Sequence, residues 1–462
     1  MYPCQYINTV IRVYGPLDLW VHAQVGVALQ LASATMASSQ PSLFQDSSPT
    51  EVLADAGSLG RHLSEFRWAG KSTSIHTTVV EVDASTVPVR TFVNEFWTSR
   101  QRAANSLHEI SYRACFKPQL PRFFVERLTR PGDVVYDPFM GRGTTILEAA
   151  LLGRVPVGCD INPLSEVLVG PRLRPPSIGS VQQRLSSVDW TCDDGFREDL
   201  LTFYHPDTLR EICSLRAYLL RKLELGPLDA VDGWIRMVAV NRLTGHSPGF
   251  FSVYTLPPNQ AVSISAQQKI NADRNQVPPL RSVAKLIVAK SRSLLADCDE
   301  ATRMTLERFA RCGQLITKPA STTPEIESSA VDLIVTSPPF LDVVDYAGDN
   351  WLRCWFCGID PVNVKLTILK RIDDWREAMT AVFAELRRTL RSGGHIAFEV
   401  GEVRGGRVRL EEHVIPCGVH AGLEPVLLLI NSQDFTKTAA CWGVDNNRKG
   451  TNTNRVVIFR KP

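Results

Sequence analysis

The sequence predicts an α/β protein in which an open sheet is interrupted by an inserted domain. Two stretches predict the sheet, because residues 132–163 alternate short apolar runs with a helix-forming run, and residues 331–336 form a further apolar run. The third observation is the length of chain between them. Residues 169–312 are too many for a loop and sufficient for a domain.

The first stretch predicts a strand, a tight turn, a helix and a second strand, in that order. These four parts are residues 134–136, a turn with Gly141 and Gly143, residues 144–152, and residues 155–159. Asp160 stands at the end of the second strand. An acid about 20 residues after a glycine turn is typical of a nucleotide-type cofactor site.

The side chains around this turn indicate which cofactor fits. The glycines let backbone N–H groups approach a ligand, and Asp160 can accept hydrogen bonds from both ribose hydroxyls. The turn lacks the third glycine of the dinucleotide fingerprint, and Asp137 just before it offers a carboxylate to a cation. This favours an amino-acid-bearing cofactor over a pyrophosphate. S-adenosylmethionine has an ammonium group, a ribose and an adenine, and it fits these groups.

The run Val331–Thr336 ends in Ser337-Pro338-Pro339-Phe340. Two prolines cannot continue a ladder of hydrogen bonds, so the chain leaves a strand there. A hydroxyl, rigid carbonyls and a flat ring suit the activation of a planar exocyclic amine, which they can bond and stack upon. The alternative is an ordinary strand end followed by a Pro-Pro turn.

Taken together, the segments Asp137–Thr145 and Thr336–Phe340 resemble the amino-methyltransferases of DNA. The Thr-Ser-Pro-Pro-aromatic form is most typical of the cytosine-N4 branch, and Phe116–Pro121 resembles the segment that precedes the cofactor loop in the same enzymes. The resemblance implies a Rossmann-like, S-adenosylmethionine-dependent methyltransferase sheet with an inserted target-recognition domain. It also implies transfer of a methyl group to the N4 amine of a cytosine flipped out of duplex DNA, at a specific site.

The resemblance carries over onto particular positions of this chain. The catalytic residues that it implies are Ser337, Pro338, Pro339 and Phe340. The cofactor-binding residues that it implies are Phe116, Lys117, Pro118, Asp137, Phe139, Gly141, Gly143, Thr144, Thr145, Asp160 and Asn162. The chemistry needs no metal.

Three departures leave the target base open. The aromatic is Phe340 where Tyr is commoner, and the glycine loop precedes the Ser-Pro-Pro motif, an order more typical of a different, often adenine-modifying, arrangement. The acid expected after the third strand, residues 314–317, is not obvious, because Lys318 follows. The alternatives are therefore an adenine-N6 DNA methyltransferase, an RNA base methyltransferase, or a DNA-binding protein without catalysis.

Composition shifts predict four segments. Residues 1–90 are expected to be a partly disordered N-terminal extension, with the ordered catalytic part beginning near Arg90. Residues 91–170 and 313–462 are the two parts of the methyltransferase domain, and residues 171–312 are the inserted target-recognition domain.

The insert has the charge expected of a face that meets phosphates. Arg236 to Arg292 contains eight Lys or Arg and one acid, Asp273. Interleaved amides such as Gln267, Gln268 and Asn271 can pair with adenine. The alternative is a solvated helix face with ordinary surface amides.

The whole chain sets looser bounds. Its net charge of +3 is too small to name a partner, and its 11 cysteines, without paired spacing, suggest reduced thiols in a cytoplasm. Cys354 and Cys357 are expected to be small buried residues of a helix rather than a metal or redox pair. No membrane span is expected. Among DNA-modifying enzymes of this kind a cognate restriction endonuclease is a partner to consider, but the sequence predicts neither its presence nor the oligomeric state.

Overall fold

The computed structural model describes most of the chain after its N-terminal segment. The described residues are 53, 56–97, 104–112, 115–192, 194–256, 261–339, 346–360, 371–403, 408–432 and 453–462. Residues Thr50–Pro462 form one compact unit. The predicted disorder of the N-terminal extension before residue 53, and the ring of Phe340, lie outside the described residues.

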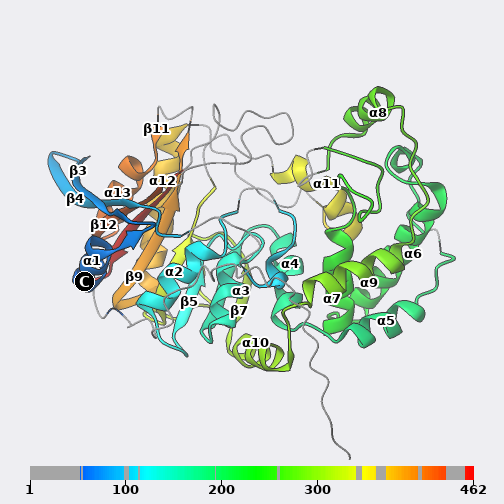
Figure 1. Cartoon of the computed structure of the whole chain (residues 1–462), viewed down its shortest axis with the longest axis horizontal. Helices are drawn as coiled ribbons and strands as arrows, with labels where there is room; N and C mark the ends of the chain where they lie inside the picture. Colours follow the sequence, from blue (N-terminus) through cyan, green and yellow to red (C-terminus); the bar gives the residue numbers. More distant parts are fainter. Residues whose placement is uncertain are drawn as a thin grey trace, which may run out of the picture. The chain divides into compact units, whose positions relative to one another are not determined.

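A nine-stranded sheet organises this unit, with strand order β3-β4-β12-β13-β9-β8-β5-β6-β7 (Figure 1). The five strands from β9 to β7 are mutually parallel, whereas β13 runs antiparallel between β9 and β12. The bounds are β3 Ser74–Val82, β4 Ser85–Asn94, β5 Val134–Asp137, β6 Val155–Asp160, β7 Gln314–Thr317, β8 Val331–Thr336, β9 Leu390–Val400, β12 Glu424–Ser432 and β13 Thr453–Arg460.

The strand order defines where a ligand is expected. After β5 the chain moves outward to β6 and β7, and it then returns to place β8 and β9 on the other side of β5. The direction of winding therefore reverses between β5 and β8. Open α/β sheets bind ligands at the carboxyl ends of the strands beside such a reversal.

The local predictions agree with the observed elements. The turn lies between β5 and α3 (Thr144–Leu151), β6 ends at Asp160, and β7 has the predicted bounds Gln314–Thr317. Short apolar strands with buried side chains on both faces are what a parallel sheet requires. The predicted α/β class is confirmed.

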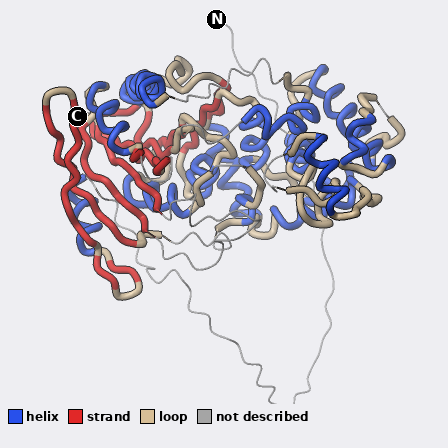
Figure 2. The backbone as a smooth tube through the Cα atoms, turned by 90° about the horizontal axis from the view of Figure 1, so that it is seen from above, coloured by secondary structure: helices blue, strands red, loops and turns tan. Residues whose placement is uncertain are grey.

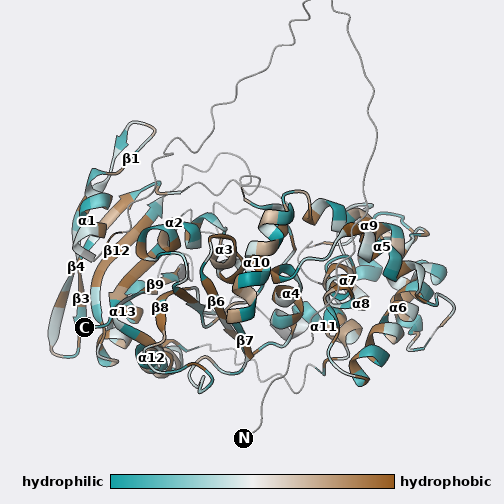
Figure 3. Ribbon diagram, turned by 90° about the horizontal axis from the view of Figure 1, so that it is seen from below, coloured by the Kyte–Doolittle hydropathy of each residue, from teal (hydrophilic) through white to brown (hydrophobic). Residues whose placement is uncertain are grey.

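Helices cover both faces of the sheet. One apolar core joins α1 (Ala56–Glu65) and α2 (Gln119–Leu128) to one face, with Val135, Leu333 and Ala397 among its members. A second core joins α12 (Ile372–Thr389) and α13 (Glu411–His420) to the other face. In Figure 3 the central strands β6, β8 and β9 are coloured mainly as hydrophobic, in keeping with this double covering.

The segment between β6 and β7 is helical, and Figure 2 shows its helices gathered away from the strands. After α4 (Leu164–Leu173) come α5 Ile178–Ser186, α6 Pro206–Glu224, α7 Ala230–Val240, α8 Ile264–Asp273, α9 Val283–Leu294 and α10 Glu300–Cys312, with a short 3₁₀ helix at Glu198–Thr202. A second short 3₁₀ helix, Ser106–His108, comes earlier in the chain, before β5. One continuous core joins Ile146 and Leu168 beneath the glycine turn to Trp234 and Phe251 of this segment. The segment therefore packs directly against the helices that follow β5 and β6.

The sheet begins earlier in the chain than the expected boundary near Arg90. Strands β3 and β4 form an antiparallel hairpin, and β4 pairs in parallel with β12. Strand β4 spans Arg90 itself, so a boundary there would cut through the sheet. Alternating burial along β3, with Val80 and Val82 inward, gave too weak a pattern to identify a strand beforehand.

The remaining elements are short or lie at the edge of the candidate site. They are β1 Arg67–Trp68, β2 Lys71–Ser72, β10 Glu402–Val403, β11 Val408–Arg409 and α11 Tyr346–Cys357. Cys354 and Cys357 of α11 are free and buried, as predicted. None of the described helices is both long and apolar enough to cross a membrane.

Candidate active site

The two sequence motifs meet at the carboxyl ends of β5 and β8. These strands pair through Val135 with Leu333 and Tyr136 with Ile334. Where they end, Thr336 Oγ1 donates a hydrogen bond of 2.6 Å to Asp137 Oδ1. The Thr145 hydroxyl also reaches across to the Val335 carbonyl, at 3.1 Å. The glycine turn and the Ser-Pro-Pro segment therefore start from touching residues.

The glycine turn needs its glycines for two different reasons. Gly141 and Gly143 have φ of +49° and +73°, a backbone region that other residues rarely adopt. A Cβ on Gly143 would also collide with the Val169 side chain of α4. The Gly141 N–H points to Asp160, at 2.8 Å from Oδ2, and is thus engaged within the protein. Conformation and close helix packing therefore explain these glycines without a ligand.

Asp137 and Asp160 make the turn acidic. The Asp137 side chain is 1% exposed, and burial raises the pKa of its carboxyl to about 7. Asp160 is partly exposed as a residue, yet desolvation of its carboxyl also raises its pKa. Among the described residues neither acid forms an ion pair. Because buried charges are normally paired, these two carboxyls suit a cationic ligand.

The segment Phe116–Pro118 lies beside this turn, as predicted. Buried Arg142, at the centre of the turn, donates from Nη2 to the Phe116 carbonyl at 3.5 Å and from Nη1 to the Ile110 carbonyl at 2.9 Å. Burial, and then the nearby Arg142 charge, lower the pKa of Lys117. Pro118 precedes α2 as its N-cap residue. Arg142 thus joins the glycine turn to the second segment that the sequence predicted to bind the cofactor.

Other candidate residues have their polar groups engaged within the protein. Thr144 Oγ1 accepts from Arg142 Nε at 3.2 Å, and Phe139 N donates to Asp137 Oδ1 at 3.0 Å. Asn162 donates from Nδ2 to the Tyr112 hydroxyl at 3.4 Å and accepts from Leu164 N at 3.1 Å. These side chains shape the turn and the start of α4.

The Ser-Pro-Pro segment is positioned by distant parts of the chain. Buried Trp375 of α12 donates its indole N–H to the Pro339 carbonyl at 2.9 Å. Ser337 lies beside Glu399, near the end of β9, because the register of β8 and β9 pairs Thr336 with Phe398, the residues just before these two. Pro338 is buried, whereas Pro339 is exposed. Because prolines donate no backbone hydrogen bond, the Trp375 contact takes the place of the missing ladder.

Sequence reasoning missed the polar residues that surround Ser337. Glu399 lies in the run His395–Val400, an otherwise mostly apolar stretch with this one acid. A carboxyl inside an otherwise apolar central strand was the available signal, since such a group is costly to bury unpartnered. For Trp375 the sequence carries no comparable signal, because a tryptophan in an amphipathic helix is an ordinary core residue.

The acid expected after β7 is absent from that strand's own end. Lys318 follows β7, its N–H donates to the Asp160 carbonyl at 3.1 Å, and its ammonium pairs with Glu325. The acid beside this strand end comes from α4 instead, where Glu166 Oε2 lies 3.5 Å from Thr317 Oγ1.

Fewer basic side chains of the insert are exposed than its sequence predicts. Arg236 donates to the Cys357 carbonyl at 2.8 Å, and Arg242 stacks at 4.0 Å on the Phe250 ring. Burial, and then the charge of Arg242, lower the pKa of Lys290 to about 8. Four basic residues of the stretch are exposed: Lys269, Arg274, Lys285 and Arg292.

The amide side chains of the insert are likewise partly buried and partly exposed. Gln267 is fully buried and donates to the Tyr254 carbonyl at 3.0 Å and to Asn271 Oδ1 at 2.8 Å. Asn271 in turn donates to the Thr202 carbonyl at 2.8 Å. These two side chains hold α8 in place and are not available to a base, contrary to expectation, whereas Gln268 is exposed.

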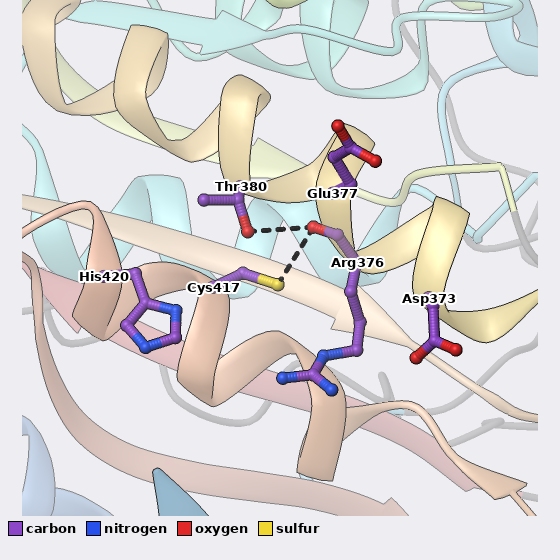
Figure 4. Close-up of a pocket in the computed structure, with 6 residues that line it drawn as sticks. All are labelled: Asp373, Arg376, Glu377, Thr380, Cys417 and His420. Atoms are coloured by element: carbon purple, nitrogen blue, oxygen red, sulfur yellow. Dashed lines mark hydrogen bonds between the residues drawn. The ribbon is translucent and has the colours of Figure 1, made fainter. Parts of the chain in front are cut away.

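A surface pocket elsewhere on the sheet has no connection with the two motifs. It lies between α12 and α13 and is lined by Asp373, Arg376, Glu377, Thr380, Cys417 and His420 (Figure 4). Thr380 and Cys417 both donate to the Arg376 carbonyl, at 2.8 and 3.5 Å. None of the predicted site residues lines it, so the chemistry is assigned to the strand ends.

Comparison with known proteins finds a family model that matches the region of the glycine turn. Residues 66–165 match the DNA methylase family of N6 and N4 enzymes. The Type II methyltransferase M.BsoBI of Geobacillus stearothermophilus is 21% identical over 327 residues, which cover 65% of this chain and 61% of that protein. The Type II methyltransferase M.MjaII of Methanocaldococcus jannaschii is 33% identical over 75 residues, 16% of this chain and 14% of that protein. This chain thus spans about three fifths of the first relative and a smaller part of the second.

Among solved structures, a DNA modification methylase of Thermus thermophilus complexed with S-adenosyl-L-methionine is 19% identical. The likeness covers 29% of this chain and 49% of that one, with a TM-score of 0.19. The fold assignment therefore comes from the chain's own sheet.

The predicted resemblance to the DNA amino-methyltransferases is confirmed, with the choice between an N4 and an N6 target left open.

Proposed function

We propose that this protein is an S-adenosylmethionine-dependent methyltransferase that acts on the N4 amine of a cytosine in duplex DNA. The observation that carries the proposal is the hydrogen bond from Thr336 to Asp137. This bond joins the acidic glycine turn, which suits a cationic ligand, to the Ser-Pro-Pro segment at the same edge of the sheet. A methyl donor and an amine acceptor need that proximity for an in-line displacement.

The turn fits the cofactor chemically. S-adenosylmethionine, when bound, supplies an electrophilic methyl group on a sulfonium. Asp137 is the group that would hold its ammonium, and the lone pairs of Asp160 left over after the Gly141 and Asn162 bonds would accept the ribose hydroxyls. Phe116 to Pro118 and Phe139 to Thr145 would complete the enclosure.

The Ser-Pro-Pro segment fits the acceptor. The lone pair of an exocyclic base amine is delocalised into the ring, which makes the amine a poor nucleophile. Hydrogen bonds from that amine to Ser337 Oγ and to the Pro338 carbonyl would favour a tetrahedral nitrogen and localise the lone pair. Phe340 would stack on the base, which must leave the duplex to reach the site.

We assign DNA contact to the insert, residues 171–312, acting as a target-recognition domain. The exposed side chains of α8, Gln268 and Lys269, are the ones that can meet a base edge and a phosphate. Helix α8 is connected to the helix after the Ser-Pro-Pro segment, because Ala261 N donates to the Asp349 carbonyl at 3.2 Å and Trp351 Nε1 to the Val262 carbonyl at 3.3 Å.

Two alternatives share this geometry. An adenine-N6 target is favoured by the motif order, in which the glycine loop precedes Ser-Pro-Pro. Serine in place of the aspartate often found in adenine enzymes favours cytosine. An RNA base is the other substrate class that the same pocket chemistry admits. A cognate restriction endonuclease is the partner implied if the DNA assignment holds.

The test uses the full chain with radiolabelled S-adenosylmethionine and three substrates: mixed-sequence duplex DNA, the same DNA lacking cytosine, and duplex RNA. We expect the cofactor to raise the melting temperature, and label to appear only in cytosine-containing DNA as N4-methylcytosine. Label in DNA lacking cytosine would assign the enzyme to adenine, and label in RNA would reassign the substrate. Cofactor binding without transfer to any nucleic acid would contradict the proposed activity.

A further inference from the structure

The two edges of the nine-stranded sheet differ in length and in protection. At one edge β7 has four residues and is followed directly by Lys318. At the other edge β3, at the outer end of the sheet in Figure 1, has nine residues and contains neither lysine nor proline. Its register with β4 runs from Ser74 to Val82 without a shift. Natural proteins usually shorten, bulge or charge an exposed edge, so β3 is unusually open to a further strand.

One face of β3 is covered, and the other carries exposed apolar side chains. Val80 belongs to the core beneath α13. On the opposite face Val79 is 60% exposed and Ile75 is 43% exposed, and these are two of the six large apolar side chains that are exposed in the described part of the chain. Val79 pairs with Pro88 of β4, which is exposed as well. Apolar surface beside an open strand edge indicates a site of strand pairing.

Side-chain contacts hold the β3–β4 hairpin in place. The hydroxyls of Thr78 and Thr91 lie 2.7 Å apart across the two strands. Where β3 ends, Asp83 Oδ2 lies 3.0 Å from Nε2 of His420, at the end of α13. Strand β4 is itself paired with β12. Because this edge is already ordered, a further strand can pair with it at little cost in conformational entropy.

Two exposed charges lie on the same face as Val79. Glu81 shares that face because side chains alternate along a strand, and Arg90 shares it because it pairs in register with Thr77. Both side chains are exposed, and neither forms an ion pair with another residue that the structure describes. The acid and the base lie on opposite sides of Val79 along the hairpin, an arrangement that is complementary to itself when it is turned by half a revolution.

This self-complementarity selects the partner. If two β3 strands pair antiparallel about a two-fold axis at Val79, that residue meets its own copy, and Glu81 lies opposite Thr77 of the second copy. Arg90 of the second copy is then one strand further on, about 10 Å away between Cα atoms, within reach of two extended side chains. The symmetry produces this ion pair twice. An unrelated strand would need the same spacing of apolar and charged residues, whereas a second copy supplies it.

We propose that β3 is the contact of a two-fold homodimer, in which two copies of this chain join their sheets into one through antiparallel β3 strands. Such pairing uses up the open edge of both copies, so the assembly closes at two chains. Four strands separate β3 from β8, so the strand ends that carry the candidate site stay open in each copy. The inference does not depend on the proposed function.

The first test is sedimentation equilibrium of the full chain over a wide range of concentration. We expect the wild type to approach twice the mass of one chain. Val79→Lys sets two ammonium groups against each other on the axis, so it should raise the dimer dissociation constant about 100-fold or more. Met304→Lys is the matched control, because Met304 is 64% exposed on α10, away from β3, and this change should leave the dissociation constant unaltered. Equal melting temperatures, measured at a concentration where all three proteins are monomeric, would show that both variants are folded.

The second test exchanges the two charges. Glu81→Arg alone and Arg90→Glu alone each place like charges together at both symmetric positions, and each should raise the dissociation constant about tenfold. The double variant restores opposite charges and should return the constant to within about threefold of the wild-type value. Recovery in the double variant is specific to this register, because a general loss of stability would add in the two changes.

Each outcome decides for or against the dimer. A wild type that stays monomeric overturns it and leaves the edge to a different partner. A dimer that Val79→Lys does not weaken has its interface on another surface, and mass that keeps rising with concentration contradicts a closed pair. Single charge variants that weaken association without recovery in the double variant overturn the two-fold pairing of β3.

Discussion

The glycine turn after β5 and the Ser-Pro-Pro turn after β8 leave neighbouring parallel strands at the same edge, yet they are built differently. The glycine turn is held by its own backbone, by Asp160 and by Arg142. The Ser-Pro-Pro turn is held by Trp375 of α12, and it starts beside β9, because Thr336 pairs with Phe398. One turn is therefore a local construction, and the other depends on the assembled sheet.

The difference follows from what each turn has to do. A glycine turn offers backbone N–H groups and charge, which a short sequence can supply by itself. Two successive prolines supply rigidity but no donors, so orientation must come from elsewhere. Substitutions near the first turn are expected to alter cofactor binding, whereas substitutions near the second are expected to alter the chemical step.

The largest effect is expected at Ser337, where a substitution should alter the chemical step and not cofactor binding. Ser337→Ala removes the hydroxyl that we assign to the amine, so kcat should fall about 100- to 1,000-fold while the cofactor dissociation constant stays within twofold. Steady-state methyl transfer and calorimetry measure the two quantities.

The matched control is Ser328→Ala. It removes an exposed hydroxyl just before β8 begins, whereas Ser337 follows the end of β8, and it should leave kcat unchanged. An unchanged rate in Ser337→Ala would remove Ser337 from the mechanism.

The next effect concerns pH and the glycine turn. The pKa of Asp137 is about 7, and a cationic ligand needs the carboxylate, so cofactor affinity should fall about tenfold for each pH unit below 7. Calorimetry between about pH 5.5 and 8.5 measures this. Asp137→Asn should flatten the pH dependence of cofactor affinity. Asp133→Asn, at the residue just before β5 begins, should leave that dependence unchanged. A dependence that persists in Asp137→Asn would assign it to another group.

The stability of the ligand-free protein should show the opposite trend. The folded pKa of Asp137 lies above its ordinary value of 3.8, so the folded state holds this proton more tightly than the unfolded chain. The contribution of Asp137 to the free energy of unfolding is therefore full below about pH 4 and is lost as pH rises through 7. Denaturant melts should show that the free energy of unfolding of wild type, relative to that of Asp137→Asn, is lower at about pH 8 than at about pH 5.

The smallest expected effect tests the anchor of the Ser-Pro-Pro turn. Trp375→Phe keeps an aromatic ring but removes the donor to the Pro339 carbonyl, so kcat should fall about three- to tenfold and stability by about 1–2 kcal/mol.

Trp234→Phe is the matched control, because Trp234 is equally buried and donates its indole N–H to Ser291 Oγ at 3.0 Å within the insert. It should lose similar stability with kcat unchanged at saturating DNA. Equal losses of kcat in both variants would mean that the effect is general loosening rather than loss of the anchor.

The sequence predicted local structure well, but it did not predict which side chains contact one another. β7 has its predicted bounds, and the glycine turn lies where the pattern indicated, because strand and turn signals depend on neighbouring residues. The amides of the insert were misjudged, since Gln267 is buried against Tyr254 while Gln268, one residue later, is exposed. Helical phase decides between them, and α8 carries too little apolar periodicity to reveal its phase.

By itself, then, the sequence determined the α/β class, the position of the glycine turn and the resemblance to a family. Only the tertiary structure brought Thr336 to Asp137, Trp375 to Pro339, and Asn454 to Glu399. The physical reason is that periodicity and turn chemistry act over a few residues. Which side chains meet at a strand end depends instead on strand order and register, which are properties of the whole folded sheet.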